Sequence, residues 1–442
     1  MFYEIQKVVI YSKIDNVRLQ YVLDIVFRLQ LGLPYELTHD IEYFLQSQEA
    51  RINYSHEKLG EKRMIQMIPN ELIEQTDIRP QPTALRSFKG IPVICRSGER
   101  DDQFPFDLFS AVFYLLTRYE EYIDPPMDQH DRFHHRASLA FEYEFLHAPL
   151  VDIWILELKK TFTLMYRDMA FPAKKFTYIP TYDIDMAWSY KHKGFLRNTG
   201  GLLRDIYHKK FDRVKERVAV CSGRRKDPFD TFAYLDQLHA QYDYQPIYFF
   251  LAGERGTYDK NIAPTHPAMK KLIADTRSKY DIGVHPSYGS HFSDEQLKKE
   301  IDLIGSKKSR QHYIKFKLPE TYRNLIRHGI TQDYSMGYGS INGYRASTSF
   351  PYLWFDLERN VVTPLEIHSF SFMDCNALFE ENKTPDQAFY TLKEMVKSVE
   401  VLGGTMMTVW HNFSLGSDPQ WAGWREMYEA FFAHVKSLQS EQ

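Results

Sequence analysis

The feature that most constrains the fold is a regular alternation of strand-like and helix-like segments that begins near residue 172. Apolar runs typical of buried strands cover 176–182, 246–251, 281–284 and 405–410. Between and after them lie segments with helical periodicity or helix-capping residues, at 229–238, 269–279, 293–304, 319–328 and 384–403. Alternation of this kind predicts a parallel α/β sheet or barrel.

The part of the chain before residue 170 has a different pattern. Short strands at 7–11 and 91–95 are mixed with helices at 18–30 and 106–122. We therefore expect two domains, a smaller α/β or α+β domain over 1–170 and the larger α/β domain over 171–442. In the first domain, the loop DQHDRFHHR holds three histidines, but two arginines stand among them. A solvated loop is the better interpretation than a metal cluster.

Composition limits the class of protein. Hydrophobic residues make up 43% of the 442 residues and charged residues 26%, which excludes a disordered chain. The net charge of −3 does not indicate nucleic-acid binding, although the segment 203–226 carries nine Lys/Arg against three Asp/Glu. That segment predicts a solvated helical insertion or, as an alternative, a patch for polyanions.

Compartment signals are few. No apolar run approaches the length of a membrane span, and the N-terminus MFYEIQKVVIYSK lacks the pattern of a secretory signal. Three widely spaced cysteines give no disulfide framework and no CxxC metal motif. We expect a cytoplasmic protein without a membrane span.

Residues capable of chemistry follow three of the predicted strands. The strand 176–182 ends in Asp183 and Asp185, the strand 281–284 in His285 and then His291, and the strand 405–410 in His411. In parallel α/β folds active sites gather at the carboxyl ends of the strands. Acids and histidines that meet there predict a His/Asp metal site with a second acid to spare.

These motifs, in this order, resemble the polysaccharide deacetylase family of metal-dependent carbohydrate esterases. TYDID, GVHPSYGSH, SRQHYIKF and TVWHNFSL are similar to its four motifs, and GYRASTSFP with FMD resembles a bacterial subfamily found with polysaccharide biosynthesis. That subfamily has an N-terminal accessory domain of unknown function, which FDLFSAVFYLLTRYEEY resembles. The resemblance implies a distorted (β/α) barrel.

The resemblance also implies roles. Asp183 is the general base, Asp185 and His285 are metal ligands, Arg310 holds the base, and His411 is the general acid. The implied activity is removal of N-acetyl groups from an amino sugar or glycan, with a divalent metal, zinc first, as cofactor. The expected partner is an acetylated sugar or a polysaccharide precursor.

The third metal ligand is open from the sequence. The family spaces two ligands as H-x-x-x-H, but here Gly289 stands four residues after His285 and the next histidine is His291. A loop bent at Pro286 and Gly289 would bring His291 to the metal, so His291 is the expected ligand and His312 its rival. Other candidates for substrate contact or alternative ligation are Tyr288, Arg345 and Asp374.

Two other functions fit the same residues. A sugar-binding relative without catalysis would keep the pocket and lose the metal chemistry. A glycoside hydrolase would use two carboxylates, such as Asp183 with Asp374, and need no metal. Metal content of the purified protein separates the deacetylase from the glycosidase.

Overall fold

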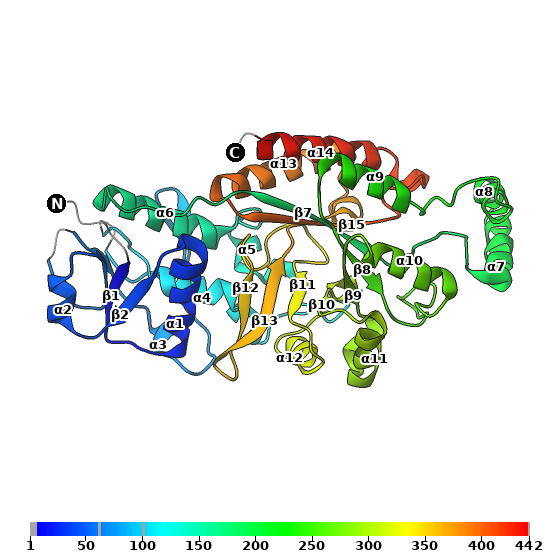
Figure 1. Ribbon diagram of the computed structural model, residues 1–442. Coiled ribbons are helices and arrows are strands. Elements are labelled where there is room, and N and C mark those ends of the chain that lie inside the picture. Colours follow the sequence, from blue (N-terminus) through cyan, green and yellow to red (C-terminus); the bar gives the residue numbers. More distant parts are fainter. Residues whose placement is uncertain (1–6, 61–62, 100–101, 441–442) are drawn as a thin grey trace.

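The computed structural model describes residues 7–60, 63–99 and 102–440. Residues 1–6, on which the expectation about an export signal partly rests, lie outside this part of the chain. The described residues form a small parallel sheet near the N-terminus and a large curled sheet after residue 176 (Figure 1). Among these residues, no helix combines the length and the apolar character needed to cross a bilayer.

The N-terminal region is built on four parallel strands in the order β2-β1-β3-β4. The strands are β1 (Val8–Ser12), β2 (Tyr35–Thr38), β3 (Ala50–Tyr54) and β4 (Ile65–Met67), with a separate hairpin of β5 (Arg86–Phe88) and β6 (Ile91–Val93). Its helices are α1 (Val17–Leu23), α2 (Ile41–Gln46), α3 (Glu71–Glu74), α4 (Leu108–Leu116), α5 (Leu139–Glu142) and α6 (Leu150–Met165). Of the two alternatives expected for this region, α/β and α+β, the parallel sheet agrees with α/β.

The expected helix 106–122 is shorter than the sequence predicts. Asp107 caps α4 by accepting hydrogen bonds from the backbone N–H groups of Phe109 and Ser110. The chain leaves the helix at Arg118, whose φ of 55° is left-handed, and continues as a 3-10 turn over 119–122. This break turns Arg118 and Glu121 toward the C-terminal region, where they meet Arg345.

The C-terminal region contains nine strands in the order β12-β13-β11-β10-β9-β8-β7-β15-β14. The strands are β7 (Thr177–Ile184), β8 (Ile247–Leu251), β9 (Asp281–His285), β10 (Lys308–Ser309), β11 (Gln332–Met336), β12 (Tyr352–Asp356), β13 (Val361–Ser369), β14 (Phe372–Met373) and β15 (Thr405–His411). All neighbours are parallel except the antiparallel pair β12 and β13. The sheet curls like half a barrel, with β12 and β14 as its edges, so the fold is mixed α/β and open on one side.

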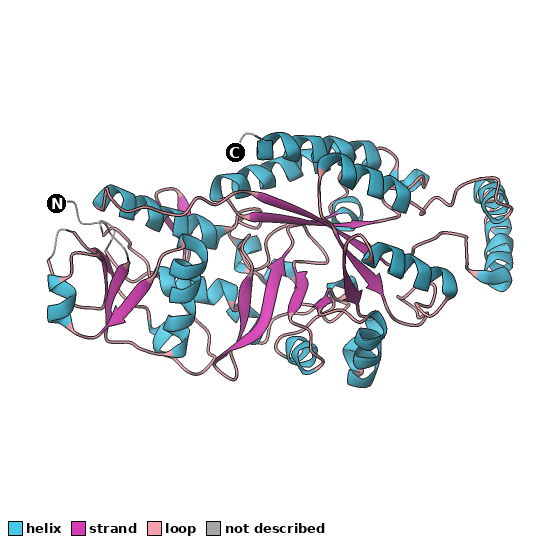
Figure 2. Ribbon diagram, viewed as in Figure 1, coloured by secondary structure: helices cyan, strands magenta, loops and turns pink. Residues whose placement is uncertain are grey.

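Helices cover the outside of this sheet (Figure 2). They are α9 (Phe232–Tyr242), α10 (Pro267–Arg277), α11 (Asp294–Ile304), α12 (Glu320–Arg327), α13 (Pro385–Leu402) and α14 (Trp424–Ser440). The capping box that the sequence predicts at Ser293–Gln296 is present only in part, because Ser293 caps α11 but Gln296 does not return to the Ser293 backbone. At Thr384, where the sequence predicts an N-cap followed by Pro385, Thr384 and Gln387 form a full capping box. The side chain of Gln296 turns away from the Ser293 backbone to donate to Ser287 Oγ and Glu300 Oε1.

The two regions share one hydrophobic core. A single cluster of buried apolar side chains contains residues of both sheets, and the rings of Phe113 and Phe355 meet at 5.1 Å between centroids. The Tyr21 hydroxyl donates to the carbonyl of Leu353 at 2.8 Å across the same contact. The N-terminal region is therefore packed firmly against the C-terminal one, while the domain boundary near residue 170 stays a prediction.

Candidate metal centre

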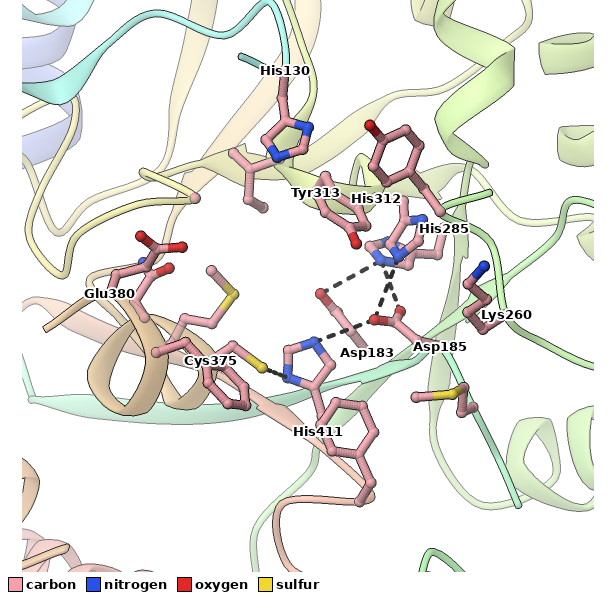
Figure 3. A pocket seen from close by; sticks show the side chains of 18 of the residues that line it. His130, Asp183, Asp185, Lys260, His285, His312, Tyr313, Cys375, Glu380 and His411 are labelled. Atoms are coloured by element: carbon pink, nitrogen blue, oxygen red, sulfur yellow. Dashed lines mark hydrogen bonds and ion pairs between the residues drawn. The ribbon is translucent and has the colours of Figure 1, made fainter. Parts of the chain in front are cut away.

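A pocket opens at the carboxyl edge of the large sheet, where the sequence places its acids and histidines (Figure 3). Its volume is about 320 Å³, at the lower end of the range for small-molecule sites. The predicted residues that line it are Asp183, Asp185, His285, His312 and His411. Strand ends far apart in the sequence thus meet at one site, as expected for parallel strands.

Asp185 lies at the centre of this group. One ligand-type atom each from Asp185, His285 and His312 falls within 4.8 Å of the other two. Asp185 Oδ1 is buried yet accepts no hydrogen bond; its nearest ionic partner is His285 Nε2 at 3.3 Å. Burial raises the pKa of Asp185, but the three neighbouring imidazoles of His312, His285 and His411 outweigh it and hold that pKa well below its usual range.

His285 is the last residue of β9, so the strand itself aims its ring at the pocket. The ring Nδ1–H donates to the backbone carbonyl of Arg310 at 2.6 Å, which leaves Nε2 facing Asp185. Metal-binding histidines are held in this way, with one nitrogen fixed by a hydrogen bond and the other presented to the metal. The predicted place of His285 agrees with this geometry.

His312 stands in a 3-10 turn after β10, and its ring lies next to that of His285, with 5.0 Å between ring centroids. Its Nε2 lies 3.4 Å from Asp185 Oδ2, while Nδ1–H donates to Asp259 Oδ1 at 2.9 Å. Burial lowers the pKa of His312, but the carboxylates of Asp185 and Asp259 outweigh it and raise that pKa to about 9. Asp259 was not among the expected site residues, although it lies in the loop after a predicted strand, where such residues gather.

His291 does not join this group. The backbone after β9 winds into a 3-10 turn over Tyr288–Phe292, and the ring of His291 lies beside Asp131, with 3.8 Å between Nε2 and Oδ2. His291 is not among the residues that line the pocket. The bend at Pro286 and Gly289 therefore carries His291 toward the N-terminal region. His312 lies beside Asp185 and His285, where the sequence predicted His291.

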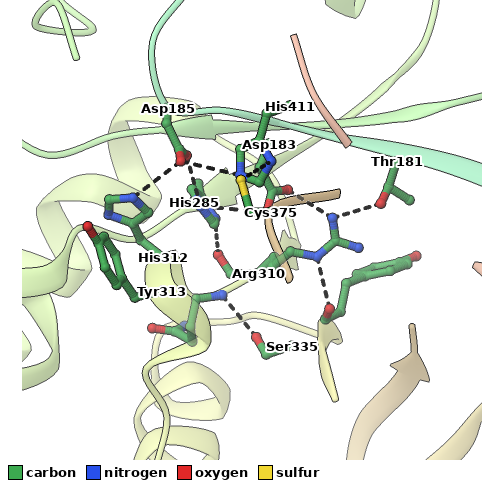
Figure 4. Close-up of polar contacts among 12 residues, drawn as sticks. Thr181, Asp183, Asp185, His285, Arg310, His312, Tyr313, Ser335, Cys375 and His411 are labelled. Carbon is green, nitrogen blue, oxygen red and sulfur yellow. Dashed lines mark hydrogen bonds and ion pairs between the residues drawn. The ribbon is translucent and has the colours of Figure 1, made fainter. Parts of the chain in front are cut away.

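Asp183 is the second acid, and Arg310 fixes it from below (Figure 4). The fully buried guanidinium donates from Nη1 to Asp183 Oδ1 at 2.8 Å and to Thr181 Oγ1 at 2.7 Å. Its Nε–H also donates to the carbonyl of Tyr334 at 3.0 Å. Asp183 Oδ2 stays on the pocket side, 3.7 Å from His285 Nε2. Arg310 is thus placed to orient Asp183, as the sequence predicts.

His411 closes the other side of the pocket from the end of β15. Its Nδ1–H donates to Asp374 Oδ1 at 2.7 Å, and Nε2 lies 3.5 Å from Asp185 Oδ2. Burial lowers the pKa of His411, but Cys375 and the carboxylates of Asp374 and Asp185 outweigh it and raise that pKa well above its usual range. The imidazole is therefore held protonated.

Asp374 lies behind His411 and has no surface exposed to solvent. Both of its oxygens accept hydrogen bonds from His411, one from the backbone N–H at 2.8 Å and one from the ring. Asp374 is not among the residues that line the pocket, so it does not face Asp183 as the second carboxylate of a glycosidase. Cys375, next along the chain, lines the pocket, and burial raises its pKa to about 12.

The rim of the pocket includes a loop from the N-terminal region. His130 forms ring contacts with Tyr258, Tyr288 and Tyr313, and its Nδ1 lies 3.2 Å from the Tyr288 hydroxyl. Arg132 anchors the loop by donating to the carbonyls of Tyr313 at 2.6 Å and Gly339 at 3.3 Å. The expectation of a solvated loop misses this contact, because no local sequence signal shows which distant surface a loop covers.

The remaining candidates lie outside the pocket lining. Tyr288 belongs to the aromatic rim, where its ring stacks on Tyr258 at 4.1 Å. Arg345 is buried between the two regions, donates to both oxygens of Glu121, and lies over the ring of Phe316. Arg345 is therefore not placed to contact a substrate in this pocket.

Comparison with known proteins adds little to this geometry. A family described as "Family of unknown function (DUF7033)" matches residues 8–167. A solved structure described as "putative polysaccharide deacetylase from Mycobacterium smegmatis" is similar at 14% identity with a TM-score of 0.39, over 61% of this chain and 87% of that one. No curated protein matches the chain. At this level of similarity the solved structure says nothing of what this chain does.

Proposed function

We propose that this chain is a metal-dependent hydrolase that removes N-acetyl groups from an amino sugar or a glycan. One observation carries the proposal. A buried carboxylate oxygen, Asp185 Oδ1, accepts no hydrogen bond, and the two oxygens of this carboxylate face the imidazoles of His285 and His312, whose outer nitrogens are already bound. A buried, unpaired carboxylate oxygen is costly unless a cation completes its surroundings.

The residues present fit a divalent metal. Asp185, His285 and His312 would hold it, and a set of one carboxylate and two imidazoles suits zinc, with an open position left for water or substrate. Both histidines have their outer nitrogens held, as metal-binding histidines require. When bound, a divalent metal lowers the pKa of a water ligand and polarises the acyl carbonyl.

Asp183 acts in this proposal as the general base. Its Oδ1 is held by Arg310, so Oδ2 is left on the pocket side to take a proton from the attacking water. The oxygen of that water then adds to the acetyl carbonyl carbon. The fixed guanidinium limits Asp183 to one orientation, which supports a base that must meet the water at a defined place.

His411 acts as the general acid. It is held protonated by its surroundings, and its Nε2 is directed toward Asp185, inside the pocket. As the carbon–nitrogen bond breaks, His411 gives its proton to the leaving amine, so that the products are acetate and the free amino sugar. Asp374 fixes the ring by accepting from Nδ1–H and thereby sets which nitrogen delivers the proton.

The rim supports a sugar as substrate. Five rings line the pocket, those of His130, Tyr258, Tyr313, Phe379 and Phe413. Rings of this kind pack against the apolar face of a sugar while their polar groups hydrogen-bond its hydroxyls. The N-terminal region takes part through His130, so we propose that the accessory domain completes the substrate site.

The experiment that tests the proposal measures acetate release from N-acetylated amino-sugar oligomers by the full chain supplied with zinc. Asp183→Asn should retain bound metal and lower kcat by about 10³-fold or more, because the base loses its charge. Asp302→Asn is the matched control, since Asp302 is an exposed acid on α11 that pairs with Lys298.

Two outcomes contradict the proposal. If Asp183→Asn and wild type release acetate equally, Asp183 is not the base. If wild type binds zinc and sugar oligomers but releases no acetate from any acetylated sugar, the chain is a binding protein and not a deacetylase.

A further inference from the structure

A helical hairpin projects from the body of the protein between β7 and α9. It consists of α7 (Gly194–Tyr207) and α8 (Phe211–Cys221), which lie side by side at the far right of Figure 1. Buried Asp227 closes its base by accepting from the backbone N–H groups of Ser189, Tyr190 and Lys191. The hairpin is thus held by a fixed base and presents most of its surface away from the sheet.

The apolar side chains of α7 point outward. In a surface helix of a globular protein they would face the core. With about 100° between successive residues of a helix, five of them fall within an arc of about 120°. Their exposed fractions are 81% for Phe195, 85% for Leu196, 62% for Leu203, 45% for Ile206 and 82% for Tyr207.

The inner side of the hairpin is polar instead. Arg217 of α8 pairs with Asp205 of α7 at 2.7 Å, and both side chains are buried. The same guanidinium donates to Asn198 Oδ1 at 3.3 Å and packs over the ring of Tyr190. The two helices are therefore joined by an ion pair, with Val220 of α8 also buried, while the apolar stripe of α7 stays exposed.

The second helix repeats the pattern. Phe211 and Val218 of α8 are 56% and 50% exposed. Around these apolar residues the segment 203–226 holds nine Lys/Arg and three Asp/Glu, an excess of six positive charges in a chain whose net charge is −3. Lys209 and Lys210 stand in the turn between the helices, next to exposed Tyr207 and Phe211.

We propose that this hairpin docks the protein onto the surface of an anionic lipid membrane. An outward apolar stripe with aromatic and leucine side chains, beside a strong excess of Lys/Arg, is the pattern of helices that lie in the membrane interface. The apolar side chains enter the boundary between headgroups and acyl chains, and the basic ones meet the lipid phosphates. This surface does not depend on the chemistry of the pocket.

Other occupants explain less of the hairpin. A nucleic acid accounts for the positive charge but leaves the apolar stripe of α7 without a role. A second copy of this chain accounts for the apolar stripe, but two such hairpins would bring like charges together. An anionic membrane matches both features at once.

The experiment measures binding of the full chain to vesicles by co-sedimentation. Vesicles of phosphatidylcholine with phosphatidylglycerol should bind the protein, and vesicles of phosphatidylcholine alone should bind it at least about tenfold more weakly. The triple variant Phe195→Ser, Leu196→Ser, Tyr207→Ser should lose about tenfold or more of the binding. Lys209→Ala and Lys210→Ala should each lose about fivefold.

The matched control is the double variant Tyr390→Ser, Val401→Ser, whose targets on α13 are 68% and 69% exposed. It should bind as wild type does, and circular dichroism should show all variants folded. The proposal is overturned if wild type does not bind anionic vesicles, or if the triple variant binds them as well as wild type. It is also overturned if light scattering shows a dimer of the wild type that the triple variant abolishes. A third contrary outcome is that the protein binds single-stranded DNA but not vesicles, and that only the lysine variants lose this DNA binding.

Discussion

The buried charges between the two regions and those at the pocket differ in whether every oxygen has a partner. Between the regions, both oxygens of Glu121 accept hydrogen bonds from Arg118 and Arg345, at 2.6 to 2.8 Å. At the pocket, Asp185 keeps Oδ1 without a hydrogen bond although several imidazoles surround it. We call the first set, Arg118, Glu121 and Arg345, the closed cluster, and the second, Asp185, His285 and His312, the open cluster.

The difference teaches how to tell a structural charge from a functional one in this fold. In the closed cluster the two arginines outweigh burial and lower the pKa of Glu121, so all three groups stay charged and mutually satisfied. Such a cluster needs no ligand or ion to complete its hydrogen bonds. The open cluster is more exposed, with the Asp185 side chain 18% exposed at the pocket, and it has an unused acceptor that a ligand could complete.

The largest expected effect is at the open cluster. Asp185→Ala should abolish stoichiometric zinc, as measured by elemental analysis, and lower deacetylation by about 10⁴-fold or more. Zinc should raise the Tm of wild type, because it binds only the folded chain, and should leave the Tm of Asp185→Ala unchanged. Asp302→Ala serves as the control. A variant that keeps full metal content would show that Asp185 is not a ligand.

The closed cluster should respond in stability and not in metal binding. Glu121→Ala leaves buried Arg345 without its carboxylate, while Arg118 keeps Glu120 at 2.7 Å. We expect the change to lower the free energy of unfolding by about 3–5 kcal/mol in urea titrations. Glu142→Ala, at an exposed glutamate of α5, should change it by less than about 0.5 kcal/mol. Loss of zinc from folded Glu121→Ala protein would break the distinction between the two clusters.

Metal affinity at the open cluster should depend on pH through His312. In the metal-free protein the pKa of this imidazole is raised to about 9, so a proton must leave before Nε2 can bind a metal. Below pH 9 the affinity for zinc should therefore fall by about tenfold for each pH unit. Asp259→Asn, which removes one of the carboxylates that raise this pKa, should reduce the pH dependence near neutrality. A flat profile in wild type would exclude His312 as a ligand.

The smallest effect is expected where the N-terminal region reaches the pocket. His130→Ala removes a ring from the rim and leaves Asp183 and the open cluster unchanged. KM should therefore rise by about three- to tenfold while kcat stays the same. His134→Ala, in the same loop but outside the pocket lining, should leave both constants unchanged. An equal fall in kcat for His130→Ala would give this loop a role in the reaction step.

Local sequence patterns predicted the positions of most strands that carry the site residues. The predicted strand 281–284 is β9, and the predicted strand 405–410 is β15, each within one or two residues. Strand 176–182 runs two residues further, so Asp183 lies inside β7 and only Asp185 follows it. The pattern of apolar residues fixes such segments because burial on both faces of a parallel sheet selects them.

Local sequence patterns could not show which histidine joins Asp185 and His285 at the pocket. The sequence favoured His291 over His312. His291 lies in the same loop as His285, and Gly289 permits the bend needed, although the spacing departs from H-x-x-x-H. The 3-10 turn over Tyr288–Phe292 and the carboxylate of Asp259 decide between them, and both depend on contacts across the loops. Arg345 shows the same limit, since an arginine in a motif that resembles the family's can belong to a buried cluster outside the pocket lining.

By itself the sequence determined the parallel α/β class of the C-terminal region, the strand ends that carry Asp183, Asp185, His285 and His411, and Arg310 as the partner of Asp183. These follow from periodicity, strand polarity and the resemblance of the motifs. Only the tertiary structure decided that the sheet stays open, that His312 and not His291 lies beside Asp185, that Asp374 lies behind His411, and that His130 reaches the pocket. The physical reason is that hydrophobic periodicity acts within a segment, whereas hydrogen bonds between side chains of different loops exist only after those segments have packed.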